Sequence, residues 1–332
     1  MLAVLLVLSI QLHAQDYKYL VLKGGGIRGI AYVGAFKVME EKSILPGIEK
    51  VAGTSVGAIT GALLCLGYSA AQMEAIMRKT VIAGFNDGEW FFIGGQKRMR
   101  RNFGWYKGRK LEEWIGKLVA ARTGNAHTTL LQLHQLALID RKFKDLYVTA
   151  TNLSRQRLDV FSWETHPNMP VAAAVRASAS IPLYYGAVFL DSLGNPVEHP
   201  KKDVFYDVYV DGGLMANYPL QLFNSGEHIP GEQVCKNTLG LKLERPEQIS
   251  YYTGHTGIAP YDIHTLPTYI AALYNLTIEQ LNRNVAYEQE RRNTIYISTG
   301  NLSPRVRHIS DDQKQLLFDN GEQAARKFFD GK

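Results

Sequence analysis

The sequence predicts one α/β domain whose central, mostly parallel sheet is covered by helices. Short apolar runs of strand length alternate with longer helical patterns over the first 80 residues, which implies a parallel sheet with helices on its faces. Of the 332 residues, 46% are hydrophobic and 20% are charged, which suffices for a large buried core. The sequence contains no internal repeat and no low-complexity linker that would divide it into separate domains.

Five elements are expected in the first part of the chain, in the order strand, helix, strand, helix, helix. They cover residues 19–23, 27–42, 48–53, 55–67 and 70–79. Glycines end the first strand, and the helix after it has apolar residues at helical spacing. Ser69 is placed to cap the last of these helices, because a serine side chain can accept a hydrogen bond from an early helical N–H.

The rest of the chain continues in the same mixed pattern. Strands are expected at residues 145–153, 157–162, 204–213, 238–243 and 294–298. The first two of these look like a strand pair. Helices are expected at residues 169–178, 266–292 and 310–329. Ser310 and Gln313 open the last helix with the spacing of a capping box.

Charge and cysteine content narrow the range of partners. Lys and Arg number 37 against 31 acidic residues, so the net charge is +6. This excess fits simple solubility, or attraction to an anionic surface such as phospholipid head groups. Cys65 and Cys235 are too few for a metal site or a disulfide framework, and the apolar run around Cys65 is typical of a core. A single disulfide between them stays open.

The first 14 residues are expected to be a signal peptide, which would make the protein periplasmic or secreted. An apolar run from Leu2 to Ile10 is followed by Ala14, a small residue suited to cleavage. The run is too short to cross a membrane, and the usual Lys or Arg before it is missing. A buried first strand or a mis-assigned start is the alternative.

The glycine loop after the first strand has two interpretations. Gly24, Gly26 and Gly29 have the spacing of a dinucleotide-binding loop, which also requires an acidic residue at the end of the next strand. Glu49 is at a suitable distance but precedes the apolar part of that strand instead of following it. The alternative is a loop whose amide groups bind an oxyanion that forms during a reaction.

Ser55 is the candidate nucleophile. It lies in a G-x-S-x-G sequence, from Gly53 to Gly57, between an expected strand and an expected helix, which is the context of a nucleophile elbow. Side chains at the two glycines would collide with neighbouring backbone in such a turn, and the helix N-terminus favours developing negative charge. A serine that attacks an ester needs amide donors for the oxyanion. Residues 24–26 can supply them, because glycine permits a close approach.

Asp211 is the candidate base. It ends an expected strand, and Gly212 and Gly213 let the chain turn away so that the carboxylate stays at the edge of the sheet. A plain turn is the alternative interpretation. None of the nine His residues lies in a motif that nominates it. A carboxylate with a pKa of about 4 is a weak base, so we expect desolvation to raise the pKa of Asp211.

Four segments together resemble the signature blocks of the patatin-like phospholipase family, in the family's order. They are GGGIRGIAYVGA, GTSVGA, ASASIP and DGGLMANYP, and the resemblance covers roughly residues 18–245. It is to the bacterial type of the family, without an appended β-barrel. It implies a three-layer α/β domain that hydrolyses acyl esters of lipids with a Ser-Asp dyad and needs no catalytic His, metal or cofactor.

The resemblance also implies roles for individual residues. Ser55 occupies the position of the nucleophile and Asp211 that of the base. The oxyanion loop corresponds to Gly24, Gly25, Gly26 and Arg28. Arg28 could equally pair with a structural carboxylate. The motifs are supported by Gly29, Gly53, Gly57, Gly212 and Gly213. We expect a catalytic core at residues 17–245 and a mainly helical extension, residues 246–332, packed on the same domain.

Residues 89–110 combine aromatic and cationic side chains outside the core motifs. The lipid-surface candidates among them are Trp90, Phe91, Phe92, Arg98, Arg100 and Arg101. Exposed aromatics beside cations suit an anionic lipid surface, so residues 90–101 are expected to form a lipid-docking flap. The same combination can bind single-stranded nucleic acid, although no nucleic acid is expected here. The structural alternative places the aromatics in the core and the cations in solvent.

The leading functional hypothesis is an exported serine hydrolase that cleaves acyl esters of phospholipids or lysophospholipids through an acyl-enzyme. A Ser-His-Asp esterase that uses His255 or His264 is one alternative, and a dinucleotide-binding oxidoreductase is another. The third is a lipid-binding module without catalysis, which the presence of both Ser55 and Asp211 disfavours. The expected partners are a lipid substrate and, peripherally, an anionic membrane surface.

Overall fold

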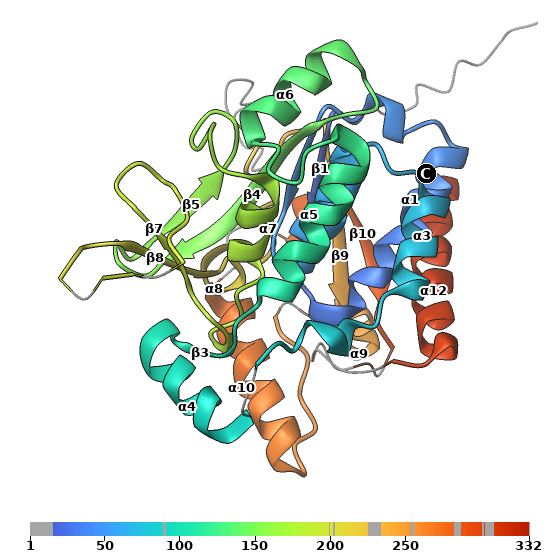
Figure 1. Ribbon diagram of the computed structural model, residues 1–332. Coiled ribbons are helices and arrows are strands. Elements are labelled where there is room, and N and C mark those ends of the chain that lie inside the picture. Colours follow the sequence, from blue (N-terminus) through green and yellow to red (C-terminus); the bar gives the residue numbers. More distant parts are fainter. Residues whose placement is uncertain are drawn as a thin grey trace, which may run out of the picture.

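The structure is a computed structural model that describes residues 16–88, 91–198, 200–201, 203–224, 234–252, 255, 257–281, 287–300, 302 and 309–331. The expected signal peptide, residues 1–14, lies outside the described residues, and so does Trp90. Figure 1 shows a central sheet flanked by helices. The predicted class, an α/β fold with a mostly parallel sheet covered by helices, is confirmed.

The main sheet has eight strands. Their bounds are β1 (Tyr19–Leu22), β2 (Lys50–Gly53), β4 (Asp145–Asn152), β5 (Arg157–Phe161), β7 (Val188–Leu190), β8 (Asp207–Asp211), β9 (Thr238–Glu244) and β10 (Thr294–Ser298). The order across the sheet is β10-β9-β1-β2-β4-β8-β7, with β5 paired to β4. The strands from β10 to β4 run parallel, whereas β5 and β8 are antiparallel to β4, and β7 to β8. A second, two-stranded sheet joins β3 (Gly104–Tyr106) to β6 (Leu183–Tyr185).

The helices fill both flanks of the sheet. Their bounds are α1 (Ala31–Glu41), α2 (Val56–Cys65), α3 (Ala70–Lys79), α4 (Phe91–Asn102), α5 (Arg109–Thr123), α6 (Leu130–Ile139), α7 (Val171–Ser178), α8 (Gly213–Ala216), α9 (Pro246–Tyr251), α10 (Leu266–Leu281), α11 (Tyr287–Arg292) and α12 (Asp311–Asp330). Short 3-10 helices cover Gly26–Ile30, Leu45–Gly47 and Ile82–Phe85. In Figure 1, α1, α3 and α12 form one flank, and α5 packs on α7 in front of the sheet.

The register of the sheet brings three chain turns to one edge. In the parallel pair of β1 and β2, Leu22 lies opposite Gly53, so the glycine loop and the Ser55 turn leave the sheet side by side. Gly53 is level with Val148 of β4, and Asp211 of the antiparallel β8 lies opposite Ala150, two residues further along the same strand. The topology alone therefore brings Asp211 to the edge where Ser55 emerges.

The C-terminal helix α12 is tightly joined to the N-terminal part of the fold. A side chain at Gly34 of α1 would have its Cβ 1.9 Å from the carbonyl oxygen of Phe318, and one at Gly321 of α12 would lie 1.9 Å from that of Ala31. The two helices thus approach backbone to backbone. The predicted capping box of Ser310 and Gln313 is present, and Ser69, predicted to cap α3, also forms a capping box with Gln72.

The structure also differs from the predicted elements in several places. The expected helix over residues 27–42 begins as the 3-10 helix Gly26–Ile30. Residues 266–292 hold α10 and α11, and residues 282–286 between them lie outside the described part. The three-residue strands β3, β6 and β7 were not predicted, because so short a run carries almost no periodic signal. Cys65 is buried as expected, and Cys65 and Cys235 are both free thiols.

Candidate active site

Ser55 lies in a strained turn between β2 and α2. Its backbone has φ 53° and ψ −120°, a combination that non-glycine residues adopt rarely and at an energetic cost. The backbone N–H of Ser55 donates to the Ser178 hydroxyl at 2.8 Å. The turn puts the Ser55 hydroxyl at the N-terminus of α2, and the residue retains 8% of its surface exposed. This is the geometry of a nucleophile elbow, as the sequence predicted.

The glycines around Ser55 are required by close backbone contacts. A Cβ at Gly57 would lie 2.3 Å from the carbonyl oxygen of Leu22, and a Cβ at Gly53 would lie 2.4 Å from the carbonyl carbon and oxygen of Gly57. No side chain fits at such distances, so any other residue at either position would displace β1 or α2. Gly29, Gly212 and Gly213 are also closely surrounded.

Asp211 is buried, and the side chain of Ser55 is close enough to affect the pKa of its carboxyl. Burial raises the pKa of the Asp211 carboxyl to about 6, and hydrogen bonds from the Gly213 N–H and the Ser55 side chain oppose this shift. The Gly213 N–H donates to Oδ1 of Asp211 at 2.7 Å. The expected effect of desolvation on this carboxyl is therefore present. A base with a raised pKa accepts a proton more readily than an ordinary carboxylate does.

The segment ASASIP holds both residues in place. Ser178 accepts the hydrogen bond from the Ser55 amide at 2.8 Å, and the carbonyl of Ser180 accepts one from the Asp211 amide at 2.9 Å. The Ser180 hydroxyl is bonded to the buried Arg176, one turn earlier on α7. The sequence identified this segment only as one of four signature blocks, and its role as the link between Ser55 and Asp211 was not predicted.

The three backbone N–H groups of the glycine loop differ in their hydrogen bonds. The Gly24 N–H donates to the carbonyl of Asn217 at 3.0 Å, so this amide is engaged within the protein. Gly25 and Gly26 begin the 3-10 helix Gly26–Ile30, and the first N–H groups of a helix have no partner inside it. Of the three glycines in the expected oxyanion loop, Gly24 therefore has an amide that is bonded within the protein, and the role of the loop stays a prediction.

Arg28 orients the peptide between Gly25 and Gly26. Its Nε donates to the carbonyl of Gly25 at 2.9 Å. Because C=O and N–H of a trans peptide point in opposite directions, this bond turns the N–H of Gly26 away from Arg28. Burial lowers the pKa of Arg28, and the carboxylate of Glu244 opposes that shift. Arg28 thus lies beside the glycine loop, and the described residues show no ion pair between it and a carboxylate.

A buried network of charges lies beneath the glycine loop. Lys23, the residue before Gly24, contacts Glu244 at 2.9 Å and Glu279 of α10 at 2.6 Å. Lys242 contacts Glu290 at 2.7 Å and Glu244 at 3.4 Å. Burial by itself would raise the pKa of Glu244, but the two lysines lower it. The loop is thereby connected to residues of the C-terminal part of the chain.

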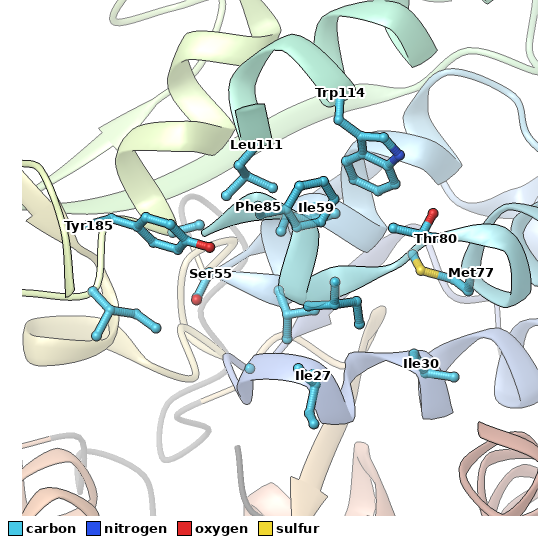
Figure 2. Close-up of a pocket in the computed structure, with 15 residues that line it drawn as sticks. Ile27, Ile30, Ser55, Ile59, Met77, Thr80, Phe85, Leu111, Trp114 and Tyr185 are labelled. Atoms are coloured by element: carbon cyan, nitrogen blue, oxygen red, sulfur yellow. The ribbon is translucent and has the colours of Figure 1, made fainter. Parts of the chain in front are cut away.

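An apolar pocket opens beside Ser55. Its empty volume is about 640 Å³, which includes open solvent at its mouth. Apart from Ser55 and Thr80, the side chains that line it are apolar or aromatic, among them Ile27, Ile30, Ile59, Met77, Phe85, Leu111, Trp114 and Tyr185. Figure 2 shows Ser55 at one end and Met77 with Thr80 at the other. The pocket suits an unbranched hydrocarbon chain attached to a group that Ser55 can attack.

The residues of the rival hypotheses lie elsewhere. His264 is exposed and pairs with Asp262 at 2.7 Å, and His255 stacks on Tyr251. Among the interactions found in the described residues neither histidine contacts Ser55, whereas the Ser55 side chain affects the pKa of Asp211. Glu49 lies 3.7 Å from Lys18 at the opposite end of β2 from the glycine loop. Across the described ranges, no group of three or more His, Cys, Asp and Glu side chains could hold a metal ion.

The lipid-surface candidates divide into structural and exposed side chains. Arg98 is half-buried, and its Nε donates to the carbonyl of Trp105 at 2.8 Å, so it supports the segment locally. Arg100 and Arg101 are exposed on α4. Phe91 and Phe92 begin α4, and their side chains lie outside the described part of the structure. None of the helices that the structure describes is long and apolar enough to cross a membrane.

Curated relatives cover most of the chain. YqhO of Bacillus subtilis is 28% identical over 316 residues, which are 93% of this chain and 96% of YqhO. A probable lipid hydrolase, 463L of Invertebrate iridescent virus 6, is 24% identical over 64% of this chain and 66% of its own length. Lysophospholipase NTE1 of Coccidioides immitis is 30% identical over 49% of this chain, but that match spans only 9% of NTE1.

Solved structures agree on the fold. VipD of Legionella pneumophila aligns with 95% of this chain and 67% of its own, at a TM-score of 0.57 and 18% identity. ExoU of Pseudomonas aeruginosa aligns with 95% of this chain and 52% of its own, at a TM-score of 0.52 and 19% identity. The sequence profile of the patatin-like phospholipase family matches residues 20–224, from β1 to beyond Asp211. The chain therefore belongs to the patatin-like phospholipase family.

Proposed function

We propose that the protein is a serine acyl hydrolase that cleaves acyl esters of phospholipids or lysophospholipids with Ser55 as nucleophile and Asp211 as base. One observation carries this proposal: Ser55 lies in a strained turn at the end of an apolar pocket, and its side chain is close enough to the buried carboxyl of Asp211 to affect the raised pKa of that carboxyl. Membership of the family and the names of two relatives, a probable lipid hydrolase and a lysophospholipase, support lipid hydrolysis in general.

The first half of the reaction forms an acyl-enzyme. Asp211 takes the proton of the Ser55 hydroxyl as its Oγ attacks the ester carbonyl carbon, and the carbonyl oxygen becomes an oxyanion. When the tetrahedral intermediate collapses, the C–O bond to the alcohol breaks and the alcohol leaves with the proton from Asp211. In the second half, water loses a proton to Asp211 and attacks the carbonyl carbon of the acyl-enzyme. When this second tetrahedral intermediate collapses, the bond from the carbon to Ser55 Oγ breaks, Asp211 returns the proton to Oγ, and the fatty acid leaves.

The glycine loop stabilises the oxyanion in both halves. The N–H groups of Gly25 and Gly26 are the donors, and the bond from Arg28 to the Gly25 carbonyl fixes the orientation of the Gly26 N–H. Donors that are already oriented cost no reorganisation during the reaction, and the loss of one such donor typically slows a reaction by roughly 100 to 1000-fold. Gly24 contributes indirectly, because its bond to Asn217 anchors the loop.

The pocket binds the acyl chain of the substrate. Its lining from Ile59 to Met77 and Trp114 offers hydrocarbon contacts along its whole length, and each buried methylene contributes about 0.8 kcal/mol. The head group then stays on the solvent side of Ser55. A short-chain soluble ester should therefore be hydrolysed with the same residues but a higher KM.

The test compares the parent protein with Ser55→Ala, Asp211→Asn and a matched control, Ser43→Ala, on a p-nitrophenyl ester and on phospholipid vesicles. Ser43 is an exposed serine whose φ of 57° is similar to that of Ser55. Both site variants should lose roughly 1000-fold or more in rate, while the control stays within about twofold of the parent. A fluorophosphonate should label Ser55, identified by peptide mass spectrometry.

Three results would contradict the proposal. Ser55→Ala could keep its activity, the fluorophosphonate could label another residue, or His255→Ala or His264→Ala could be as inactive as Asp211→Asn. The last result would restore the Ser-His-Asp alternative. Export is proposed separately: expression in a bacterial host should yield a mature protein that begins at Gln15, and an intact N-terminus would refute the signal peptide.

A further inference from the structure

Helix α10 has an unusual distribution of charge. Its 16 residues, Leu266–Leu281, include a single charged side chain, Glu279. That carboxylate points into the protein and contacts the buried Lys23 at 2.6 Å. A helix on the surface of a globular protein normally turns its charges to solvent and its apolar residues to the core. In α10 the one charge is inside.

Three large apolar side chains of α10 are exposed among those that the structure describes. Tyr269, Leu273 and Leu276 are exposed to 53%, 53% and 49%. Their spacing of four and three residues puts them on one face of the helix, while Ile278, on the opposite face, is 4% exposed. Single exposed apolar residues are normal, but an aligned stripe without any charge marks an interaction surface.

The stripe lies next to the active site. Helix α10 packs against α8, the short helix that begins two residues after Asp211. Figure 1 shows α10 and α4 at the same end of the molecule, with α6 at the opposite end. The exposed cations of α4 are Lys97, Arg100 and Arg101. This end of the molecule therefore combines an apolar stripe, cations and the neighbourhood of Ser55 and Asp211.

We propose that the α10 stripe (Tyr269, Leu273 and Leu276) and the cations of α4 form the surface on which the protein docks to an anionic phospholipid bilayer. This inference rests on the proposed function, because a bilayer is where its substrate would be found. The charge of this surface identifies its partner as an anionic bilayer. An apolar protein partner would not need the cations of α4, whereas anionic head groups attract them. The α10 stripe then enters the boundary between head groups and acyl chains.

The cations and the apolar stripe should depend differently on the lipid to which the protein binds. The cations favour phosphatidylglycerol over phosphatidylcholine, and that preference weakens as salt rises. The stripe contributes on either lipid, because the burial of leucine does not depend on head-group charge. Each leucine changed to glutamate should weaken vesicle binding by about tenfold, from the lost transfer of its side chain out of water.

The experiment measures sedimentation with vesicles of phosphatidylglycerol and, separately, of phosphatidylcholine. The full chain carries Ser55→Ala throughout, so the lipids stay intact and binding is measured apart from catalysis. The test variants are Leu273→Glu with Leu276→Glu, and Arg100→Glu with Arg101→Glu. The matched control is Leu138→Glu with Ile139→Glu on α6, whose side chains are 74% and 85% exposed at the far end of the molecule.

We expect both test variants to lose binding to phosphatidylglycerol by about tenfold or more, and the α6 control to bind as the parent does. With an intact Ser55, the leucine variant should hydrolyse a soluble short-chain ester within about twofold of the parent rate, which shows that it is folded. The proposal is overturned if the α6 control loses binding equally, or if the leucine variant binds vesicles as well as the parent. Loss of ester hydrolysis by Ser55→Ala tests the proposed function independently.

Discussion

Replacement of Asp211 by asparagine should make the protein more stable at neutral pH and inactive at every pH. Burial raises the pKa of this carboxyl from 3.8 to about 6. The raised pKa means that Asp211 favours the folded state at low pH, and that this advantage disappears as pH rises through about 6. A shift of about two pKa units corresponds to about 3 kcal/mol. Asparagine does not ionise and can still accept the hydrogen bond from the Gly213 N–H.

The assay is urea unfolding of the parent and of Asp211→Asn at about pH 4 and about pH 8. The free energy of unfolding of the variant minus that of the parent should increase by about 2 to 3 kcal/mol between these pH values. Asp159→Asn is the control of opposite sign. Burial alone would raise the pKa of Asp159, but hydrogen bonds from its neighbours outweigh burial and lower it. The free energy of unfolding of Asp159→Asn should therefore be lower than that of the parent at about pH 8. The difference between the two should be smaller at about pH 4.

A difference between Asp211→Asn and the parent that does not change with pH would refute the reasoning, because it would mean that Asp211 is not desolvated when folded. The same titration predicts the pH dependence of the reaction. The base must be ionised to take a proton from Ser55, so kcat/KM of the parent should rise through about pH 6 to a plateau. Suppose that Asp211→Asn is inactive but kcat/KM of the parent does not rise near pH 6. Asp211 would then be essential for the reaction, but its pKa would not be raised to about 6.

Three further substitutions test the packing that supports the site. Ser55→Gly should be about 1 kcal/mol more stable to urea than Ser55→Ala, since glycine relieves the positive φ; equal stability would argue against strain. Gly57→Ala should fail to yield soluble folded protein, because its Cβ would lie 2.3 Å from a carbonyl of β1, whereas Gly84→Ala, which meets nothing within 4 Å, should express normally. Glu279→Gln should lower the free energy of unfolding by about 3 kcal/mol, against less than about 1 kcal/mol for Asp330→Asn in an exposed pair.

The elbow and the base were predictable because both depend on local geometry that the sequence records. Only glycine fits at Gly53 and Gly57, and only glycine lets the chain turn directly after Asp211, so the required residues appear at a fixed spacing. The strand–turn–helix context of Ser55 could be inferred from the apolar runs on either side. The sheet edge shared by Ser55 and Asp211 then follows from strand pairing.

What could not be predicted depends on contacts between distant parts of the chain. The engagement of the Gly24 amide by Asn217 links residues that are far apart in sequence, and no pattern in either segment indicates it. The link from Ser178 to Ser55 is of the same kind. Arg98, expected at a lipid surface from composition alone, instead donates to a backbone carbonyl seven residues away. Composition reveals which side chains are present but not which of them the fold turns inward.

The charge network beneath the glycine loop shows that the active site depends on more of the chain than the family match. The match ends at residue 224, yet Lys23, next to the loop, is neutralised by Glu244 and by Glu279 of α10. A buried ammonium group that lost both carboxylates would be left unpaired at a cost of several kcal/mol. The same helix turns its apolar face outward beside α8. Because Glu279 and the α10 stripe belong to one helix, the proposed docking of that stripe to a bilayer should also affect Lys23, the residue that precedes the glycine loop.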